Sequence, residues 1–148
     1  MNLLAPVLLA GLLLAPSAHA RLCALSIDST DQMRFSQNEL KVAADCTQVK
    51  LTLRHTGTLA ASAMGHNWVL TRSADHQPVA MAGMRMTLAD SYLPNGDARV
   101  LAHTPVIGGG QSSTITFSTA KLRKGEGYTF FCSFPGHFAM MKGRFVFG

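Results

Sequence analysis

Short segments in which apolar and polar residues alternate recur along the chain and constrain its fold most strongly. Val49, Leu51 and Leu53 alternate with polar neighbours, which is the two-residue period of a half-buried strand. The composition and alternation of residues 113–118, 128–132 and 143–147 predict further strands. Glycine-rich turn signals lie between these segments, for example at residues 108–110. The pattern predicts an all-β sandwich or barrel.

The segment from Ser73 to Asp90 does not follow this pattern. It is rich in alanine and methionine, which are good helix formers. We expect a long crossover between strands that carries a short helix, with Pro78 near the start of the helix. No internal repeat and no linker divides the sequence after residue 20, so we expect a single domain there.

The first twenty residues have the features of a signal peptide for export. An apolar run from Leu3 to Ala15 has the length of a signal-peptide core, and Ala18-His19-Ala20 is an A-x-A cleavage site. No lysine or arginine precedes the run, which departs from the usual pattern. We predict a signal peptide at residues 1–20 and a mature domain at residues 21–148. The residues before Cys23 are not the small ones of a lipoprotein site, so we expect no membrane anchor.

The charge distribution argues against nucleic-acid binding. The sequence has 13 Lys or Arg and 8 Asp or Glu, a formal net charge of +5. The basic residues are spread along the chain, and the densest group is only Lys121, Arg123 and Lys124. Nucleic-acid proteins gather such residues into a stripe. The excess of positive charge indicates a mild preference for acidic partners.

The three cysteines suggest two different roles. Cys23 and Cys46 lie 23 positions apart near the predicted mature N-terminus, and Cys132 lies far from both. Disulfides persist in exported proteins, and an odd count leaves one thiol over. Pairing Cys23 with Cys46 would leave Cys132, which by itself could be only a buried, inert thiol.

The neighbours of Cys132 indicate metal chemistry instead. Cys132, His137 and Met141 have the spacing C-x4-H-x3-M, and His66 offers a second imidazole. Two imidazoles, a thiolate and a weak thioether are the donor set of blue-copper electron-transfer sites. A structural zinc site would more typically show paired C-x2-C or H-x3-H spacings, and the sequence has neither.

These motifs resemble the azurin family of bacterial cupredoxins over essentially all of the predicted mature chain. The resemblance lies in Asp31-Gln32-Met33, in residues 64–70, in residues 99–104, in residues 130–137 and in Met141-Lys142-Gly143. It implies an eight-stranded Greek-key sandwich with a helical flap in a crossover. It also implies one copper per chain, with His66, Cys132 and His137 as strong ligands and Met141 as the axial ligand. The carbonyl of Gly65 would approach from the opposite side, and Cys23 and Cys46 would form the family's disulfide.

The resemblance implies roles for further residues. Asn67 would brace the site through hydrogen bonds to the ligand loop. Met33, Met64, Phe134, Pro135 and Met140 would form an apolar patch around the exposed edge of His137. Met140 adjoins Met141 and is the competing axial candidate. Phe138 and Met140 depart from the residues common in the family, and neither removes a ligand. We expect Trp68 in the core, and His76 and His103 at the surface.

The sequence therefore predicts a periplasmic type 1 copper protein that passes single electrons between redox partners. Partners such as c-type cytochromes or periplasmic reductases would dock transiently on the apolar patch of a monomer. We expect no enzyme, because a copper reductase would need a second cluster of histidines and the sequence shows none. The alternative is a periplasmic copper-binding or delivery protein, which the eight methionines favour.

Overall fold

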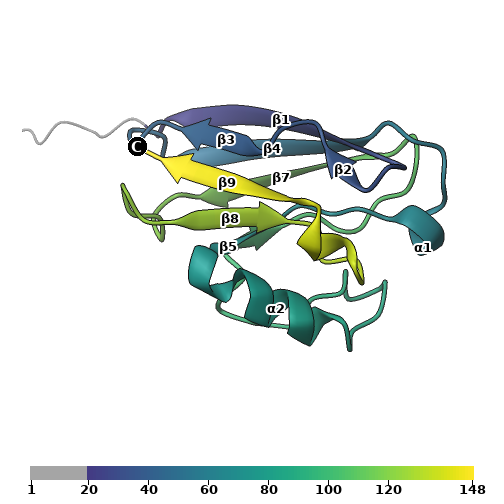
Figure 1. Ribbon diagram of the computed structural model, residues 1–148. Helices are drawn as coiled ribbons and strands as arrows, with labels where there is room; N and C mark the ends of the chain where they lie inside the picture. Colours follow the sequence, from purple (N-terminus) through teal and green to yellow (C-terminus); the bar gives the residue numbers. More distant parts are fainter. Residues whose placement is uncertain (1–19) are drawn as a thin grey trace, which may run out of the picture.

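Two β-sheets packed face to face form the body of the protein (Figure 1). The computed structural model describes residues 20–148, so the predicted signal peptide lies outside the described residues, apart from Ala20. The first sheet has the order β2-β1-β4-β7, with β1 at Leu22–Thr30, β2 at Arg34–Phe35, β4 at Gln48–His55 and β7 at Ser112–Ser118. The second has the order β3-β9-β8-β5-β6, with β3 at Glu39–Val42, β5 at Val69–Arg72, β6 at Ala102–His103, β8 at Tyr128–Phe131 and β9 at Lys142–Phe147.

Strands β2 and β3 are the two ends of one segment that leaves the first sheet and joins the second. β2 pairs with β1, whereas β3 pairs with β9, and only Ser36, Gln37 and Asn38 lie between them. Counted as one strand, this segment reduces the nine strands of residues 20–148 to the eight that were predicted. The predicted all-β sandwich is therefore confirmed.

The alternating segments form strands where the pattern predicted them. Along β4, residues Val49, Leu51 and Leu53 are fully buried between exposed or half-buried neighbours. Strand β1 was not among the predicted strands, although Cys23, Leu25 and Ile27 alternate with more exposed residues. β1 runs parallel to β4 over eight residue pairs, and this is the most extensive pairing in the first sheet.

The crossover helix is also present and covers one sheet from outside. A short 3₁₀ turn at Ser73–Asp75 leads into α2 at His76–Gly83, with Pro78 in its first turn. Val79 and Ala80 of α2 are buried in a small apolar cluster that includes Phe131 of β8. Figure 1 shows α2 below β5 and β8 and a shorter helix, α1 at Ala61–Met64, at the end of the sandwich. The sequence analysis did not predict α1.

The core between the sheets is aromatic, and a disulfide secures one end of it. Trp68 is fully buried and packs against the rings of Phe117, Phe130 and Phe145. Cys23 and Cys46 form the predicted disulfide, with 5.8 Å between their Cα atoms. Within residues 20–148, no helix is long and apolar enough to cross a membrane.

Candidate metal centre

Three side chains that are far apart in the sequence meet at one end of the sandwich. His66 follows α1, Cys132 follows the last residue of β8, and His137 begins a 3₁₀ turn at His137–Ala139 that precedes β9. Their possible ligand atoms all lie within 4.8 Å of one another, and all three residues are buried. The Cys132 Sγ atom is 3.8 Å from Nδ1 of His66 and 3.7 Å from Nδ1 of His137.

Backbone hydrogen bonds hold the loop that carries Cys132 and His137. The amide of Cys132 donates to the carbonyl of Met141 over 3.0 Å, which extends the pairing of β8 with β9 by one step. The amide of Met141 donates to the carbonyl of His137 over 2.8 Å. Gly136 precedes His137 with φ of 83°, a conformation that glycine adopts readily. Backbone hydrogen bonds and the conformation of Gly136 therefore determine the shape of the loop that carries Cys132 and His137.

A hydrogen bond to a backbone carbonyl determines which tautomer His66 adopts. Nε2 of His66 lies 2.8 Å from the carbonyl oxygen of Thr30, and because a carbonyl only accepts, Nε2 carries the proton. The unprotonated Nδ1 then faces Cys132, as metal ligation requires. The sequence analysis missed this contact, since a backbone carbonyl leaves no signal in the residue type.

The backbone at Gly65 comes close to the same centre. Its carbonyl oxygen is 4.0 Å from Cys132 Sγ. A Cβ atom at this position would overlap the carbonyl oxygen of Ala61 and the side chain of Val106. Only glycine therefore fits between α1 and the loop before β7 while presenting its carbonyl to the centre.

Burial distinguishes the two adjacent methionines. Met141 is 1% exposed and belongs to the same apolar cluster as Cys132, whereas Met140 is 77% exposed. A thioether that contacts a buried metal must itself be buried, so Met141 is the candidate that fits and Met140 is not.

Asn67 links the two segments that carry the candidate ligands. Its side-chain oxygen accepts a hydrogen bond of 2.8 Å from the amide of Ser133, and its amide donates to the Ser133 hydroxyl over 2.7 Å. The same Asn67 amide and the Ser133 hydroxyl both donate to the carbonyl of Ser91. Ser91 and Ser133 were not singled out from the sequence. The hint was a small hydroxyl, Ser133, inside an otherwise aromatic ligand loop.

Burial determines the proton content of the centre. Burial raises the pKa of the Cys132 thiol to about 12. The backbone amides of Asn67 and Phe134 donate towards the sulfur and oppose this rise in pKa. The same removal from water, with the nearby His66 as a smaller cause, lowers the pKa of His137 to about 4. Burial also lowers the pKa of His66. At neutral pH the metal-free centre therefore holds one thiol and two neutral imidazoles.

The donor set fits copper. A soft sulfur ligand and two imidazoles suit both oxidation states of that metal. The group of three contains no carboxylate, and its fourth neighbours are a thioether and a carbonyl rather than the strong fourth ligand of a structural zinc site. The residues present can thus hold a copper ion, with no further side chain required.

A further histidine packs on the centre from behind. The ring of His55 is buried and stacks on the ring of His66, with 4.5 Å between their centroids. Nε2 of His55 donates to the carbonyl of Met64 over 2.8 Å, and its Nδ1 accepts from the amide of Gly57. His55 thereby fixes both the ring plane of His66 and the end of α1.

The five residues of the predicted apolar patch are all at least partly accessible. Met140 is exposed, and Met33, Met64, Phe134 and Pro135 are half-buried. Phe134 stacks on the ring of His137, with centroids 4.5 Å apart. The patch thus adjoins His137, which at 3% is the most exposed of the candidate ligand side chains.

Three other expectations had different outcomes. Trp68 lies in the core, as predicted, and His103 is exposed. His76 is only half-exposed, because its ring packs edge-on against Phe131 and Phe138. The expectation of a surface His76 was therefore wrong in part. The aromatic residue at position 138 makes this packing possible.

Comparisons with known proteins agree with this centre. Residues 21–148 match the family described as copper binding proteins, plastocyanin/azurin family. The chain is 53% identical to an azurin of Bordetella pertussis over 121 residues, 82% of this chain and 81% of that one. It is 49% identical to azurin-2 of Alcaligenes xylosoxydans over 126 residues, 85% of this chain and 98% of that one. Among solved structures, the azurin iso-2 of Methylomonas sp. strain J superposes with a TM-score of 0.82 at 40% identity, covering 85% of this chain and 98% of that one.

The protonation state of the centre leads to a prediction for metal uptake. At pH 6 we expect about one proton to be released per copper(II) bound, because ligation displaces the proton from the Cys132 thiol. As the pH falls towards the lowered pKa values of the two histidines, about 4 at His137, imidazolium protons must also leave, so release rises above one. A pH-stat titration of the metal-free protein measures both values. Cys132→Ser should lose the proton at pH 6, and equal release from this variant and the parent protein would contradict the assignment.

Proposed function

Because the chain belongs to the plastocyanin/azurin family of copper-binding proteins, we propose that it is a type 1 copper protein that carries single electrons between redox partners. The main support is the buried meeting of one thiol and two imidazoles within 4.8 Å. When bound there, copper supplies one-electron cycling between Cu(II) and Cu(I). The proposed role involves carriage of electrons and no catalysis.

The chain's own contribution is to hold the ligands in place. Thr30 orients His66, the carbonyl of Met141 fixes Cys132, and the carbonyl of Phe134 receives the amide of His137 over 2.9 Å. These bonds engage backbone groups and the Nε2 atom of His66 and leave the sulfur and both Nδ1 atoms facing one another, so the chain itself orients the ligands. A ligand set that does not rearrange when the charge changes favours rapid electron transfer. Met141 and the carbonyl of Gly65 would supply the weaker contacts to the copper ion, and Asn67 would brace the ligand loop.

The proposed docking surface is the apolar patch beside His137. His66 is fully buried behind His55, whereas His137 reaches the patch through its stacked neighbour Phe134. Electrons would therefore enter and leave along His137. The apolar patch is easily desolvated, which suits brief encounters of a monomer with c-type cytochromes or reductases. The export signal predicted at residues 1–20 would place these encounters in the periplasm.

The delivery alternative fits the centre less well. A protein that hands copper to another needs ligands that the acceptor can reach. Here Cys132 and His66 are fully buried, and His137 is nearly so. The exposed methionines Met81 and Met84 lie on the crossover helix and its end, not among the buried donors.

The copper assignment is tested through the colour of the oxidised protein. The parent protein loaded with copper(II) should be intensely blue, because that colour requires a cysteine thiolate bound to Cu(II). We expect Cys132→Ser to abolish the visible band while circular dichroism remains that of the parent β-fold. Cys23→Ser/Cys46→Ser, which removes the other two thiols, should stay blue. A Cys132→Ser variant that remains blue would overturn the assignment.

The two adjacent methionines give a matched test of the axial position. Met141→Leu should keep the blue colour and raise the reduction potential, since losing a donor disfavours Cu(II) more than Cu(I). Met140→Leu makes the same chemical change at an exposed site and should leave the potential nearly unchanged. Voltammetry of both variants measures the difference, and the opposite pattern would move the axial ligand to Met140.

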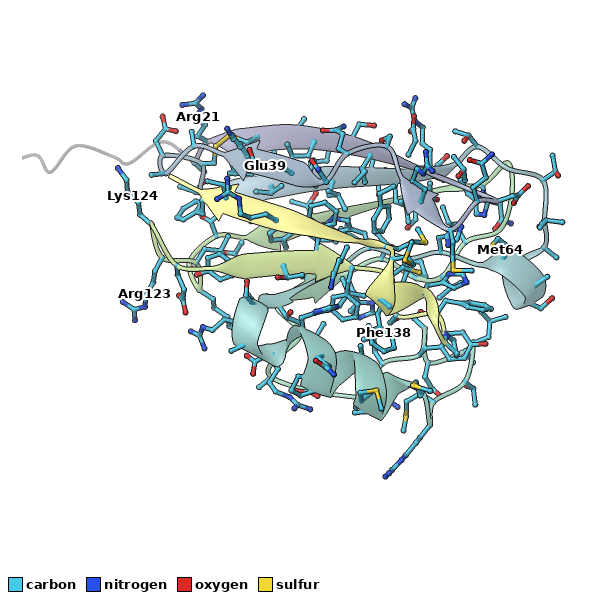
Figure 2. The ribbon with its side chains drawn as sticks, in the orientation of Figure 1. Arg21, Glu39, Met64, Arg123, Lys124 and Phe138 are labelled. Carbon is cyan, nitrogen blue, oxygen red and sulfur yellow. A yellow bond between two sulfur atoms is a disulfide. The ribbon has the colours of Figure 1, made fainter. Side chains whose placement is uncertain are left out.

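The apolar patch is tested by electron self-exchange between two copies. Met64→Lys places a charge at the patch, and two such charges about 8 Å apart in water repel by about 0.5 kcal/mol, or roughly twofold in rate. Burial of the charge on docking should add to this slowing, and salt should reduce it. The control is Leu22→Lys, which adds the same charge at an exposed apolar residue beside Arg21, at the end opposite Met64 (Figure 2). NMR line broadening gives both rates, and equal rates would move the docking surface elsewhere.

A further inference from the structure

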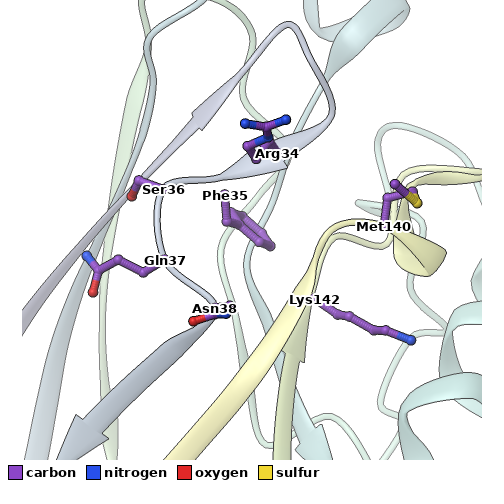
Figure 3. A pocket seen from close by; sticks show the side chains of 7 residues that line it. All are labelled: Arg34, Phe35, Ser36, Gln37, Asn38, Met140 and Lys142. Carbon is purple, nitrogen blue, oxygen red and sulfur yellow. The ribbon is translucent and has the colours of Figure 1, made fainter.

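A hollow with a basic rim adjoins the proposed docking patch. It has a volume of about 400 Å³ and lies where the chain passes from β2 to β3 beside the start of β9. Its lining residues are Arg34, Phe35, Ser36, Gln37, Asn38, Met140 and Lys142 (Figure 3). Figure 3 shows Phe35 between the segment that carries Arg34 and the strand that carries Lys142. We call this hollow the basic groove.

The two cations of the groove have no acidic partner. Among residues 20–148, neither Arg34 nor Lys142 lies within ion-pair distance of a carboxylate, and both are exposed. The acidic residue that follows the lining segment is Glu39, and it is already paired with Arg144 and Lys41. Arg34 and Lys142, at the rim of the groove, therefore carry positive charges that are not paired with any carboxylate of the described chain.

The groove adjoins the loop that carries the candidate ligand His137. Met140 lines it and also belongs to the apolar patch, and its amide donates to the carbonyl of His137 over 3.0 Å. Lys142 pairs across the sheet with Phe131, the residue directly before Cys132. A protein that covers the patch at His137 therefore also reaches the rim of the groove.

We propose that the basic groove receives acidic side chains of the electron-transfer partner and fixes its orientation over His137. This proposal rests on the proposed electron-transfer function. Charge complementarity supports it: the chain carries a net charge of +5, and two of its unpaired cations flank this groove. Arg34 can bind a carboxylate with two parallel hydrogen bonds. The apolar patch supplies contact area, and the groove supplies orientation and rate.

The test compares an acidic and a basic redox protein as electron donors. Reduced flavodoxin is the acidic probe and reduced cytochrome c is the basic one, and loss of the blue colour in a stopped-flow instrument gives the second-order rate. At low ionic strength we expect Arg34→Gln and Lys142→Gln each to slow the reaction with flavodoxin about threefold. Neither variant should slow the reaction with cytochrome c. The difference should vanish at high salt.

Two variants at the far end of the molecule provide matched controls. Arg123→Gln and Lys124→Gln make the same chemical changes at exposed cations that also lack an ion-pair partner within residues 20–148 (Figure 2). They should alter the flavodoxin rate less than 1.5-fold. Equal slowing by control and groove variants would show that only net charge matters and would overturn the proposal.

A second measurement separates this proposal from the proposed function. Oxidised flavodoxin is titrated into the copper(I)-loaded protein, and amide NMR shifts are followed without any electron transfer. Shifts at residues 34–38 and 140–142 that weaken in Lys142→Gln support the groove even if the parent protein transfers electrons poorly. Shifts confined to other faces overturn it. The same shifts produced by inorganic phosphate, beyond those of chloride at equal ionic strength, would replace the acidic partner by a free anion.

Discussion

The gathering of a thiol and two imidazoles in the protein interior is the constraint on which the rest of the structure depends. A buried polar group is costly unless it is hydrogen-bonded, and a buried unpaired charge costs far more. Here the metal-free groups are neutral, because burial raises the pKa of Cys132 and lowers the pKa of His66 and His137. The Nε2 atom of His66, which faces away from the centre, is bound to the carbonyl of Thr30. The donor atoms are left free to face one another.

The sandwich provides this arrangement because strand ends are rigid points. Cys132 follows β8 and Met141 precedes β9, and these strands are antiparallel neighbours. The hydrogen bond from the Cys132 amide to the Met141 carbonyl continues their ladder into the loop. On the other side, His66 forms an isolated bridge with Ile107, so the segment after α1 is held as a strand would be. The close-packed aromatic core around Trp68 supports both the β8–β9 loop and the segment after α1. It therefore restricts the movement of the ligands that these segments carry.

What could be predicted from the sequence follows from how local each signal is. The C-x4-H-x3-M spacing and the alternation in β4 and β9 lie within short stretches, so both the loop and the strands were predictable. The contact of His66 with the Thr30 carbonyl joins residues 36 apart through a backbone atom, and no residue type records it. The passage from β2 to β3 depends on which sheet each end pairs with, which is a tertiary choice. The packing of His76 against Phe138 required the fold to bring the crossover helix onto the ligand loop.

Within residues 20–148, most acidic side chains of the surface are already engaged in ion pairs or hydrogen bonds, whereas Arg34 and Lys142 at the groove are not. Five of the eight acidic residues pair with arginine or lysine: Asp28, Glu39, Asp45, Asp97 and Glu126. A sixth, Asp31, accepts hydrogen bonds from Thr58 and Leu59, which lower its pKa. The excess positive charge is therefore carried by cations without partners.

The position of those cations matters more than their number. Exposed charges more than about 10 Å from a contact are screened by physiological salt, so those at the far end add little to a docked complex. Arg34 and Lys142 border the patch residue Met140, within the region that a partner at His137 would cover. An apolar patch alone allows many orientations of a partner, because contact between apolar surfaces has no preferred direction. In the proposed complex, cations at one edge of the patch would break that equivalence, so the apolar contact and the charges together would favour one approach to His137.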